Sequence, residues 1–339
     1  MDDNKLYGEI LEEAYATGIG RTPVLPVSYP KGEIFAKMEW FNRFRSVKDR
    51  AAFFMLKSAE KTGVLTKDKT IIEASSGNTG IAIANIARLL GYHAELYVPA
   101  SSSPETIARL KETGNAIIEV EDENSRRGKI NIDASIRRLK ERISEDPARF
   151  VNFDQYSNRA NTLGHFYSTG PEITSVLDKI THVVVGIGTG GTITGLAKYF
   201  KTFYPRVKIV AVEPSADHHI QGLKNLSVSA VPDLIRENRS LIDSWITVDD
   251  SDAREGVKEL MELKSVIVGF SSGANFMACR KLMAEEPGSR ILTIFPDSAE
   301  KYRSVYTSTG VIREEVFDTL SANINTVPDD AILCDFSDP

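Results

Sequence analysis

The sequence has little cysteine: only Cys279 and Cys334 occur in a chain of 339 residues. So few thiols argue against a disulfide framework and indicate a reducing compartment. Cys279 lies in an apolar helical pattern, which favours a buried thiol over a reactive one. Because the acidic start (residues 1–4) lacks the apolar stretch of a signal peptide, and no run of about 18 apolar residues occurs, we expect a cytoplasmic protein without a membrane span.

An excess of positive charge is also absent, since the net charge is −6. Nucleic-acid partners usually require a basic face, so none is expected. The composition, 42% hydrophobic and 26% charged, is typical of a globular protein, and the length allows two domains.

From residue 70 onward, strand patterns alternate with helix patterns. Apolar runs at 70–74, 94–98, 115–120, 181–186, 207–212 and 290–295 predict strands. Amphipathic stretches between them predict helices, which indicates an α/β protein with parallel sheets covered by helices. The irregular stretch 147–165 is the expected boundary between two such units. We expect irregular structure over 214–245 and an acidic tail over 311–339.

One glycine-rich loop follows the apolar run His182–Val185 and precedes a predicted helix. It reads Gly188-Thr189-Gly190-Gly191-Thr192. Free backbone N–H groups and the helix dipole make such a loop a site for an anion, most often a phosphate. The spacing Gly186-x-Gly188-x-x-Gly191, with Glu213 further on, also fits a dinucleotide fingerprint, so an NAD-dependent dehydrogenase is one hypothesis.

A second loop, Ser75-Ser76-Gly77-Asn78-Thr79-Gly80, also lies between a strand and a helix. Its N–H groups and hydroxyls could hold a carboxylate or a second phosphate. Helix capping by a serine is compatible with either role.

Lys48 falls in the first turn of a helix expected from about Val47 to Thr62. The positive end of the helix dipole lowers the pKa of an ammonium there, and lysines with lowered pKa form Schiff bases. Most lysines at helix starts are simply solvated, so the position alone does not decide between a Schiff-base lysine and a solvated one.

The combination of Ser46-Val47-Lys48-Asp49-Arg50 with both glycine loops resembles the pyridoxal-phosphate enzymes of fold type II, most of all the cysteine synthase and cystathionine β-synthase branch. The resemblance runs from Gly20 to about Tyr302 and includes Phe295-Pro296-Asp297-Ser298. It implies two domains with the cofactor in the cleft between them. Residues 45–155 would form the smaller, mobile domain, and residues 1–44 with 156–310 the larger one.

The resemblance also implies roles for individual residues. Lys48 would form the Schiff base with pyridoxal 5'-phosphate and later move the α-proton. Gly188, Thr189, Gly190, Gly191 and Thr192 would bind the cofactor phosphate, Asn78 its phenolic oxygen and Ser298 its pyridine nitrogen. Ser75, Ser76, Gly77 and Thr79 would bind the substrate carboxylate, and Gln155 would line the same carboxylate site or the nucleophile site.

The implied reaction is β-replacement on O-acetylserine or O-phosphoserine, with sulfide as the first expected nucleophile and L-cysteine as product. An amino-acid amine giving a diaminopropionate precursor, or homocysteine giving cystathionine, are alternatives. A homodimer is also implied.

Several positions depart from the family pattern. Arg43 and Arg159 stand where relatives usually have proline, and a solvated surface position is the simpler interpretation of each. The segment 215–232 is short and contains Lys224, which resembles the basic residue of phosphoserine-using relatives and could bind a dianionic leaving group. The neighbouring His218 and His219 lack a ligand pattern, so no metal site is expected.

Overall fold

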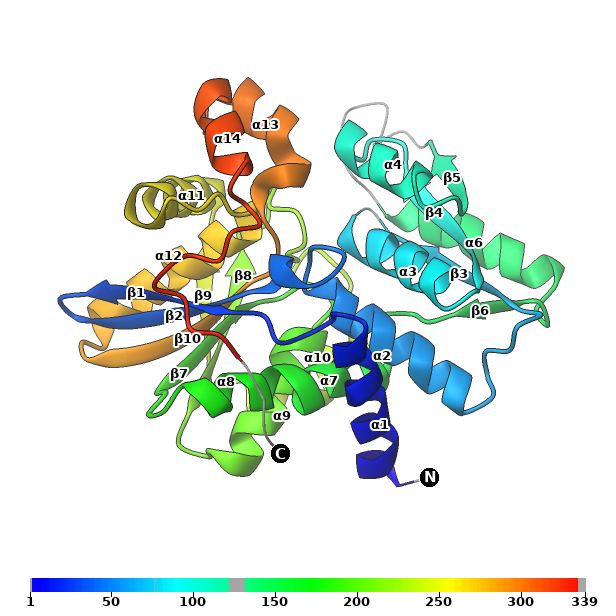
Figure 1. Cartoon of the computed structure of the whole chain (residues 1–339), viewed down its shortest axis with the longest axis horizontal. Helices are drawn as coiled ribbons and strands as arrows, with labels where there is room; N and C mark the ends of the chain where they lie inside the picture. Colours follow the sequence, from blue (N-terminus) through cyan, green and yellow to red (C-terminus); the bar gives the residue numbers. More distant parts are fainter. Residues whose placement is uncertain (1, 76, 122–131, 335–339) are drawn as a thin grey trace.

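The computed structural model describes residues 2–75, 77–121 and 132–334. Two β-sheets, each covered by helices, lie side by side (Figure 1). The expected fold class, an α/β chain with two mostly parallel sheets, is confirmed. No helix within the described residues is long and apolar enough to cross a lipid bilayer.

The smaller sheet has four parallel strands in the order β5-β4-β3-β6. Parallel neighbours need a crossover, and helices between the strands supply it. On strand β3, Ile71 and Ile72 are fully buried in two different apolar clusters, since successive side chains point to opposite faces. The elements are β3 (Thr70–Ala74), α3 (Asn78–Leu89), β4 (His93–Pro99), α4 (Pro104–Lys111), β5 (Ala116–Val120), α6 (Asp133–Glu145) and β6 (Phe150–Asn152).

The larger sheet has six strands in the order β1-β2-β10-β7-β8-β9. Strand β1 is antiparallel to β2, and all other neighbours are parallel. Figure 1 shows α11 and α12 on one side of this sheet and α8 and α9 on the other. The strands are β1 (Val24–Tyr29), β2 (Gly32–Met38), β7 (His182–Gly186), β8 (Lys208–Pro214), β9 (Ser244–Val248) and β10 (Ser289–Phe295).

Both faces of the larger sheet are buried. Val184 of β7 lies in one apolar cluster with α11 and α12, while Val183 and Val185 lie in another with α9. A strand buried on both faces reads as a continuous apolar run, which is why β7 was easy to predict. The helices beside this sheet are α7 (Arg159–Gly164), α8 (Gly170–Val176), α9 (Gly191–Phe203), α10 (Asp233–Asn238), α11 (Asp250–Lys264) and α12 (Phe270–Glu285), with the π-helical turn η2 (His165–Thr169) and the 3₁₀ turn η3 (Arg239–Leu241).

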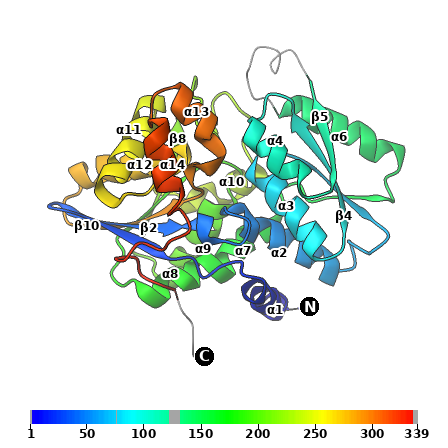
Figure 2. The same cartoon turned by 45° about the horizontal axis from the view of Figure 1, so that its top comes forward.

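Helix α2 (Lys48–Lys61) lies between the two sheets in both cartoon views (Figures 1 and 2). Its residues 51–56 are all buried, because α1 (Asp3–Ala16), α3 and α7 pack around it. A helix surrounded in this way has a fixed axis, so its first residue is held at the junction of the two sheets. The 3₁₀ turn η1 (Glu39–Phe41) precedes it.

The expectation of irregular structure over 214–245 is wrong in part. Helix α10 forms within it, and β9 begins at Ser244 as an edge strand. Helix α10 has six residues, too few for a clear helical period, and β9 is mostly exposed or half-buried, so neither carries a strong apolar pattern.

The C-terminal residues expected to form an acidic tail contribute to the core as far as Cys334. Phe317 and Ile324 are buried, and Ile332 exchanges two backbone hydrogen bonds of 2.8 Å with Val24 of β1. The exposed acidic residues of this segment alternate with apolar ones that pack inward. The elements here are η4 (Ala299–Tyr302), α13 (Arg303–Ser308) and α14 (Glu314–Ser321).

Candidate active site

Lys48, the first residue of α2, is half-buried where the two sheets meet. The start of α2 is fixed to the chain that follows β10. Val47 N donates to Pro296 O at 2.9 Å, and Ser46 pairs with Asp297 in an antiparallel bridge. In the part of the chain that the structure describes, Lys48 Nζ makes no hydrogen bond or ion pair. The amine is therefore positioned by the backbone and has no partner to displace among the described residues.

The pKa of Lys48 is lowered to about 8. Burial is the largest cause, Asp297 opposes it, and Lys301 adds a smaller lowering. The direction expected from the sequence is confirmed, although removal from water, rather than the helix dipole, is the main source. A fraction of the amine is consequently neutral near pH 7.

A buried group of charged side chains connects helix α2 to neighbouring elements. Arg50 contacts Glu39 at 2.7 Å and Glu172 at 2.6 Å, and Lys37 contacts Glu172 at 2.8 Å. Burial alone would raise the pKa of Glu172, but Arg50 and Lys37 outweigh it and hold that pKa well below its usual range. The group joins α2 to β2 and α8 with balanced charge, so it orients α2 without leaving an unpaired ion.

The glycine loop 187–191 connects β7 to α9, as predicted. Gly190 has φ of 91°, a conformation that favours glycine, and α9 begins at Gly191. A Cβ on Gly188 would lie 2.3 Å from Gly222 O, and one on Gly191 2.0 Å from Asn161 Oδ1. Among the described residues, no acceptor is paired with the N–H groups of Gly188, Thr189, Gly190 or Thr192.

Two threonine hydroxyls of this loop are held by neighbouring side chains. Thr189 Oγ1 accepts from Asn161 Nδ2 at 3.2 Å, and Thr192 Oγ1 lies 3.1 Å from His165 Nε2. The loop thus presents unpaired N–H groups, oriented hydroxyls and a helix N-terminus, which is the donor set that a phosphate requires.

The second loop joins β3 to α3 at the carboxyl edge of the smaller sheet. Ser75 Oγ accepts from Gly80 N at 2.8 Å and from Gly77 N at 3.3 Å. Ser75 therefore has the structural role of holding the turn, in addition to any ligand role. Ser76 lies outside the described residues.

Side chains of the second loop bond to other parts of the site. Asn78 Nδ2 donates to Asp297 Oδ2 at 2.7 Å, and Thr79 Oγ1 donates to Gln155 Oε1 at 2.7 Å. The backbone O of Gln155 accepts from Asn161 Nδ2, which also reaches the glycine loop. These bonds bring Asn78, Thr79 and Gln155 together with the glycine loop.

Ser298 is buried and pairs with Val268 in an isolated bridge just beyond β10. The preceding residue, Asp297, accepts at Oδ2 from Asn78 and also from Lys301 Nζ at 2.9 Å and Tyr302 OH at 2.8 Å. Asp297 therefore fixes Asn78 and the Ser298 backbone beside the start of α2.

Lys224 lies against the glycine loop. Its backbone N donates to Ile187 O at 2.7 Å, and its Nζ lies 4.7 Å from the centre of the Tyr156 ring. Burial lowers the pKa of Lys224, and Asp133 partly opposes that effect. The residue places a cation at the edge of the site without an ion pair shorter than 4 Å to a described residue.

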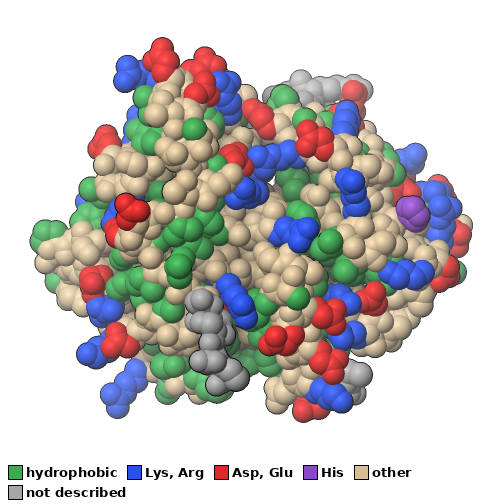
Figure 3. Space-filling view, viewed as in Figure 1, with side chains coloured by type: hydrophobic (Ala, Val, Ile, Leu, Met, Phe, Trp, Pro, Cys, Tyr) green, Lys and Arg blue, Asp and Glu red, His purple; other side chains and the backbone are tan. Residues whose placement is uncertain are grey.

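The space-filling view shows a hollow between the parts of the molecule that carry α13 and α4, with Lys or Arg side chains at its rim (Figure 3). The residues around Lys48 fit pyridoxal phosphate: one unpaired amine for the aldehyde, and one cradle of donors for the phosphate. Within the described residues, no group of three or more His, Cys, Asp or Glu side chains is arranged to hold a metal ion.

Glu213, the acidic residue of the dinucleotide fingerprint, lies near the end of β8. Its Oε1 accepts from Leu226 N at 2.6 Å, so this carboxylate orders the following segment. The arginines that depart from the family pattern are exposed: Arg43 donates to Thr17 O, and Arg159 pairs with Asp3.

The sequence interpretation missed three residues that organise the site: Asn161, His165 and Asp297. Asp297 was visible only as the neighbour of Ser298, and Asn161 only as part of a departure from a pattern. His165 lies among apolar residues and gives no local signal.

Known proteins match this chain in sequence and in structure. A family described as "Pyridoxal-phosphate dependent enzyme" matches residues 15–297. Cysteine synthase of Aquifex aeolicus (strain VF5) is 38% identical over 297 residues, covering 84% of this chain and 88% of that protein. Cysteine synthase B of Salmonella typhimurium is 34% identical over 304 residues, covering 88% and 96%. The structure of O-acetylserine dependent cystathionine beta-synthase from Helicobacter pylori matches with a TM-score of 0.77 and 32% identity, covering 85% of this chain and 95% of that one.

Proposed function

Because this chain belongs to the family of pyridoxal-phosphate dependent enzymes, we propose that it replaces the β-substituent of an O-activated L-serine by sulfide and forms L-cysteine. One observation carries the proposal: the Lys48 amine, with a pKa of about 8 and no described partner, follows directly on residues that pair with Pro296 and Asp297, and Asp297 also holds Asn78. The family relation identifies the chain as an enzyme and pyridoxal phosphate as its cofactor.

In this proposal Lys48 holds the cofactor aldehyde and then acts as the base at the substrate Cα. The bound cofactor supplies an electron sink for negative charge at Cα. The lowered pKa of Lys48 suits proton removal and return near neutral pH, since a base works best when its pKa lies near the working pH.

The cofactor is oriented at three further points. The loop over residues 188–192 would hold its phosphate, Asn78 would donate to its phenolic oxygen, and Ser298 would be the partner of its ring nitrogen. A neutral hydroxyl at Ser298 would not protonate that nitrogen, and a ring in this state would supply chemistry suited to loss of a group from Cβ rather than to transamination.

The substrate carboxylate binds at the second loop in this proposal. Ser75, Ser76, Gly77 and Thr79 would provide the donors for it, and Gln155 accepts from the Thr79 hydroxyl at 2.7 Å. Residues 45–155, which contain every strand of the smaller sheet, form the mobile domain that closes on the substrate. Residues 1–44 and 156–310 form the larger domain, followed by the segment 311–339.

Lys224 is the candidate contact for the leaving group. A free cation at the edge of the site would pair with the phosphate of O-phosphoserine, whereas an acetyl group needs no cation. The proposal therefore includes both O-acetylserine and O-phosphoserine, and Lys224 is the residue that would set the enzyme's preference between them. Homocysteine or an amino-acid amine are the alternative nucleophiles, and a solved relative is named for O-acetylserine-dependent cystathionine synthesis.

A matrix of steady-state assays tests the proposal. O-acetylserine and O-phosphoserine are each combined with sulfide, homocysteine and glutamate, and kcat/KM is measured for each pair. The highest value is expected with sulfide. A higher kcat/KM with homocysteine or glutamate would identify that compound as the nucleophile in place of sulfide. The absence of product from every pair would refute β-replacement.

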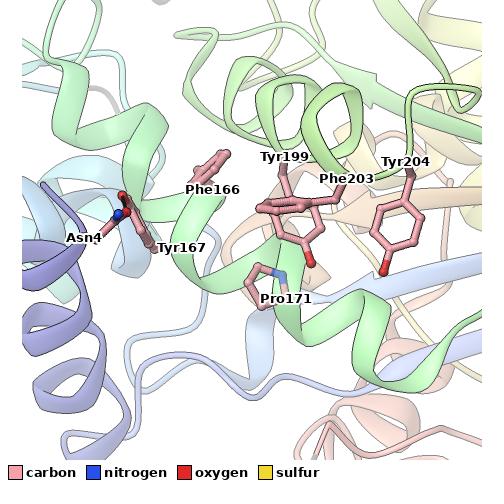
Figure 4. A pocket seen from close by; sticks show the side chains of 7 residues that line it. All are labelled: Asn4, Phe166, Tyr167, Pro171, Tyr199, Phe203 and Tyr204. Atoms are coloured by element: carbon pink, nitrogen blue, oxygen red, sulfur yellow. Dashed lines mark hydrogen bonds between the residues drawn. The ribbon is translucent and has the colours of Figure 1, made fainter.

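The protein is also proposed to be a cytoplasmic homodimer that binds small molecules. Both cysteines are free thiols, as in proteins of reducing compartments. A groove of about 600 Å³ beside α1 and α9 exposes aromatic side chains that a second copy would cover. Its lining residues are Asn4, Phe166, Tyr167, Pro171, Tyr199, Phe203 and Tyr204 (Figure 4).

A further inference from the structure

His165 lies on the π-helical turn η2, directly behind the glycine loop. Its side chain is buried, with only 1% of the residue exposed. Both ring nitrogens reach threonine hydroxyls: Nδ1 lies 2.8 Å from Thr169 Oγ1, and Nε2 lies 3.1 Å from Thr192 Oγ1. A π-turn is rare and is often found at functional sites, so this contact needs an explanation.

The packing that makes the contact is unusually close. A Cβ on Gly195 of α9 would lie 2.6 Å from His165 Cβ and 2.4 Å from Thr162 O. Glycine at 195 therefore lets η2 approach α9 closely enough for an imidazole to reach Thr192. The hydroxyls of Thr162 and Thr194, 2.9 Å apart, join α9 to α7, the helix that runs directly into η2.

Burial keeps the imidazole of His165 neutral. Its pKa is lowered to about 3, first by burial and then by Arg50, with a smaller lowering from Lys48, while Glu39 and Glu172 oppose the shift. A neutral imidazole carries one N–H and one acceptor nitrogen, so its two contacts must have opposite directions.

The direction is decided by what Thr192 has to do. If Nε2 accepted from Thr192, the hydroxyl hydrogen would point away from a phosphate in the loop. If Nε2–H donates to Thr192 Oγ1, that hydrogen is free to donate to the phosphate, and Thr169 donates to Nδ1.

We propose that His165 is a positioning residue of the phosphate cradle, which donates from Nε2 to Thr192 Oγ1 and so directs the Thr192 hydroxyl toward the cofactor phosphate. This inference rests on the proposed place of that phosphate in the loop. It concerns affinity for the phosphate group, since His165 has no described contact with a residue that would handle substrate.

The test compares the binding of pyridoxal phosphate and of pyridoxal, which lacks the phosphate, to the apoenzyme. His165→Asn, too short to reach Thr192, is expected to raise the Kd of pyridoxal phosphate about tenfold and that of pyridoxal less than twofold. His165→Gln, whose amide can stand in for Nε2–H, is expected to keep the Kd of pyridoxal phosphate within threefold of the wild type. His93→Asn, at an exposed histidine of β4, is the matched control and should change neither.

Thr192→Val separates this inference from the proposed phosphate site. Thr192→Val is expected to weaken binding of pyridoxal phosphate, and adding His165→Asn should weaken it less than twofold further. If Thr192→Val weakens binding of pyridoxal phosphate but His165→Asn does not raise the Kd of pyridoxal phosphate more than that of pyridoxal, only the role of His165 is refuted. If Thr192→Val has no effect, the phosphate site itself is wrong. Loss of affinity in His165→Gln equal to that in His165→Asn would also refute the donor role.

Discussion

Three lysines near the candidate site have a pKa below the usual range, and their partners distinguish their roles. Lys301 is buried in an ion pair with Asp297, and Lys224 lies over the Tyr156 ring. Lys48 is the member of this trio without a described partner for its amine. A partner-free amine can form a covalent bond without first breaking an ion pair, so the structure favours Lys48 for the Schiff base.

The lowered pKa of Lys48 predicts how the stability of the apoenzyme depends on pH. Below pH 8 both the folded and the unfolded chain carry the charge, and the folded chain bears its full burial cost. Between about pH 8 and 10.5 the folded chain has already lost the proton, so stability rises with pH until the cost disappears. Lys48→Met should therefore stabilise the apoenzyme at pH 7, by on the order of 1–3 kcal/mol, and much less at pH 10.

Urea unfolding of the two apoenzymes at both pH values checks this prediction. Lys31→Met, at an exposed position, is the control and should show no pH-dependent gain. An equal gain for Lys48→Met at pH 7 and pH 10 would mean that packing, rather than the buried charge, causes it.

Lys224 should set the preference between leaving groups. Removing its cation by Lys224→Ala is expected to lower kcat/KM for O-phosphoserine about tenfold, with less than a threefold change for O-acetylserine, because a charge-assisted hydrogen bond contributes about 1.5–3 kcal/mol. Steady-state kinetics with sulfide gives the ratio. Lys258→Ala, on the exposed side of α11, is the control, and an equal loss with both substrates would assign Lys224 a structural role.

At the scale of the elements, α2 depends on the buried charges that join it to β2 and α8. Arg50→Met would leave Glu39 buried without a described ion-pair partner and Glu172 with Lys37 as its remaining described one. Breaking a buried ion pair from one side costs about 3–5 kcal/mol, so the urea midpoint should fall accordingly.

Two variants identify the cause of that loss. Arg43→Met, which removes an exposed arginine of the same region, should change stability by less than about 0.5 kcal/mol. Adding Glu39→Met to Arg50→Met should recover part of the loss, because Glu39 is the carboxylate that loses its cation while Glu172 keeps Lys37. If Arg50→Met stays within about 1 kcal/mol of the wild type, the charges do not hold α2.

The elements differ in how far the sequence predicts them. Strands such as β7 and β8 are buried on both faces and have continuous apolar runs, so their positions could be predicted. The edge strand β9, the short helix α10 and the π-turn η2 have no such pattern, because tertiary packing rather than local periodicity determines them.

The same division applies to the candidate site. Lys48 and the two glycine loops could be identified because strand–glycine–helix motifs are local in sequence. His165 acts through a contact with Thr192, 27 positions away in the sequence, and Asp297 through a contact with Asn78, which is still more distant. A single sequence contains no signal for such pairs.

At the scale of the whole molecule, the aromatic groove of Figure 4 should be the dimer interface. Phe203 is 57% exposed and Tyr204 is 44% exposed. Large aromatic side chains that are exposed together commonly mark a protein–protein interface. Phe203→Glu should convert the dimer to a monomer in sedimentation velocity at micromolar concentration. Leu263→Glu, at an apolar residue of α11 that is 50% exposed and outside the groove, should remain dimeric. A wild-type monomer, or a dimeric Phe203→Glu variant, would contradict this interface.

The central claim is that Lys48 holds pyridoxal phosphate between the two sheets, and borohydride reduction of the holoenzyme tests it most directly. Reduction fixes the cofactor to the lysine that carries it, and peptide mapping by mass spectrometry identifies that lysine. The structure predicts the added mass on the peptide that contains Lys48, with loss of labelling in Lys48→Ala. Labelling of Lys224 or Lys301 in the wild-type protein, or no label on any lysine, would contradict the account.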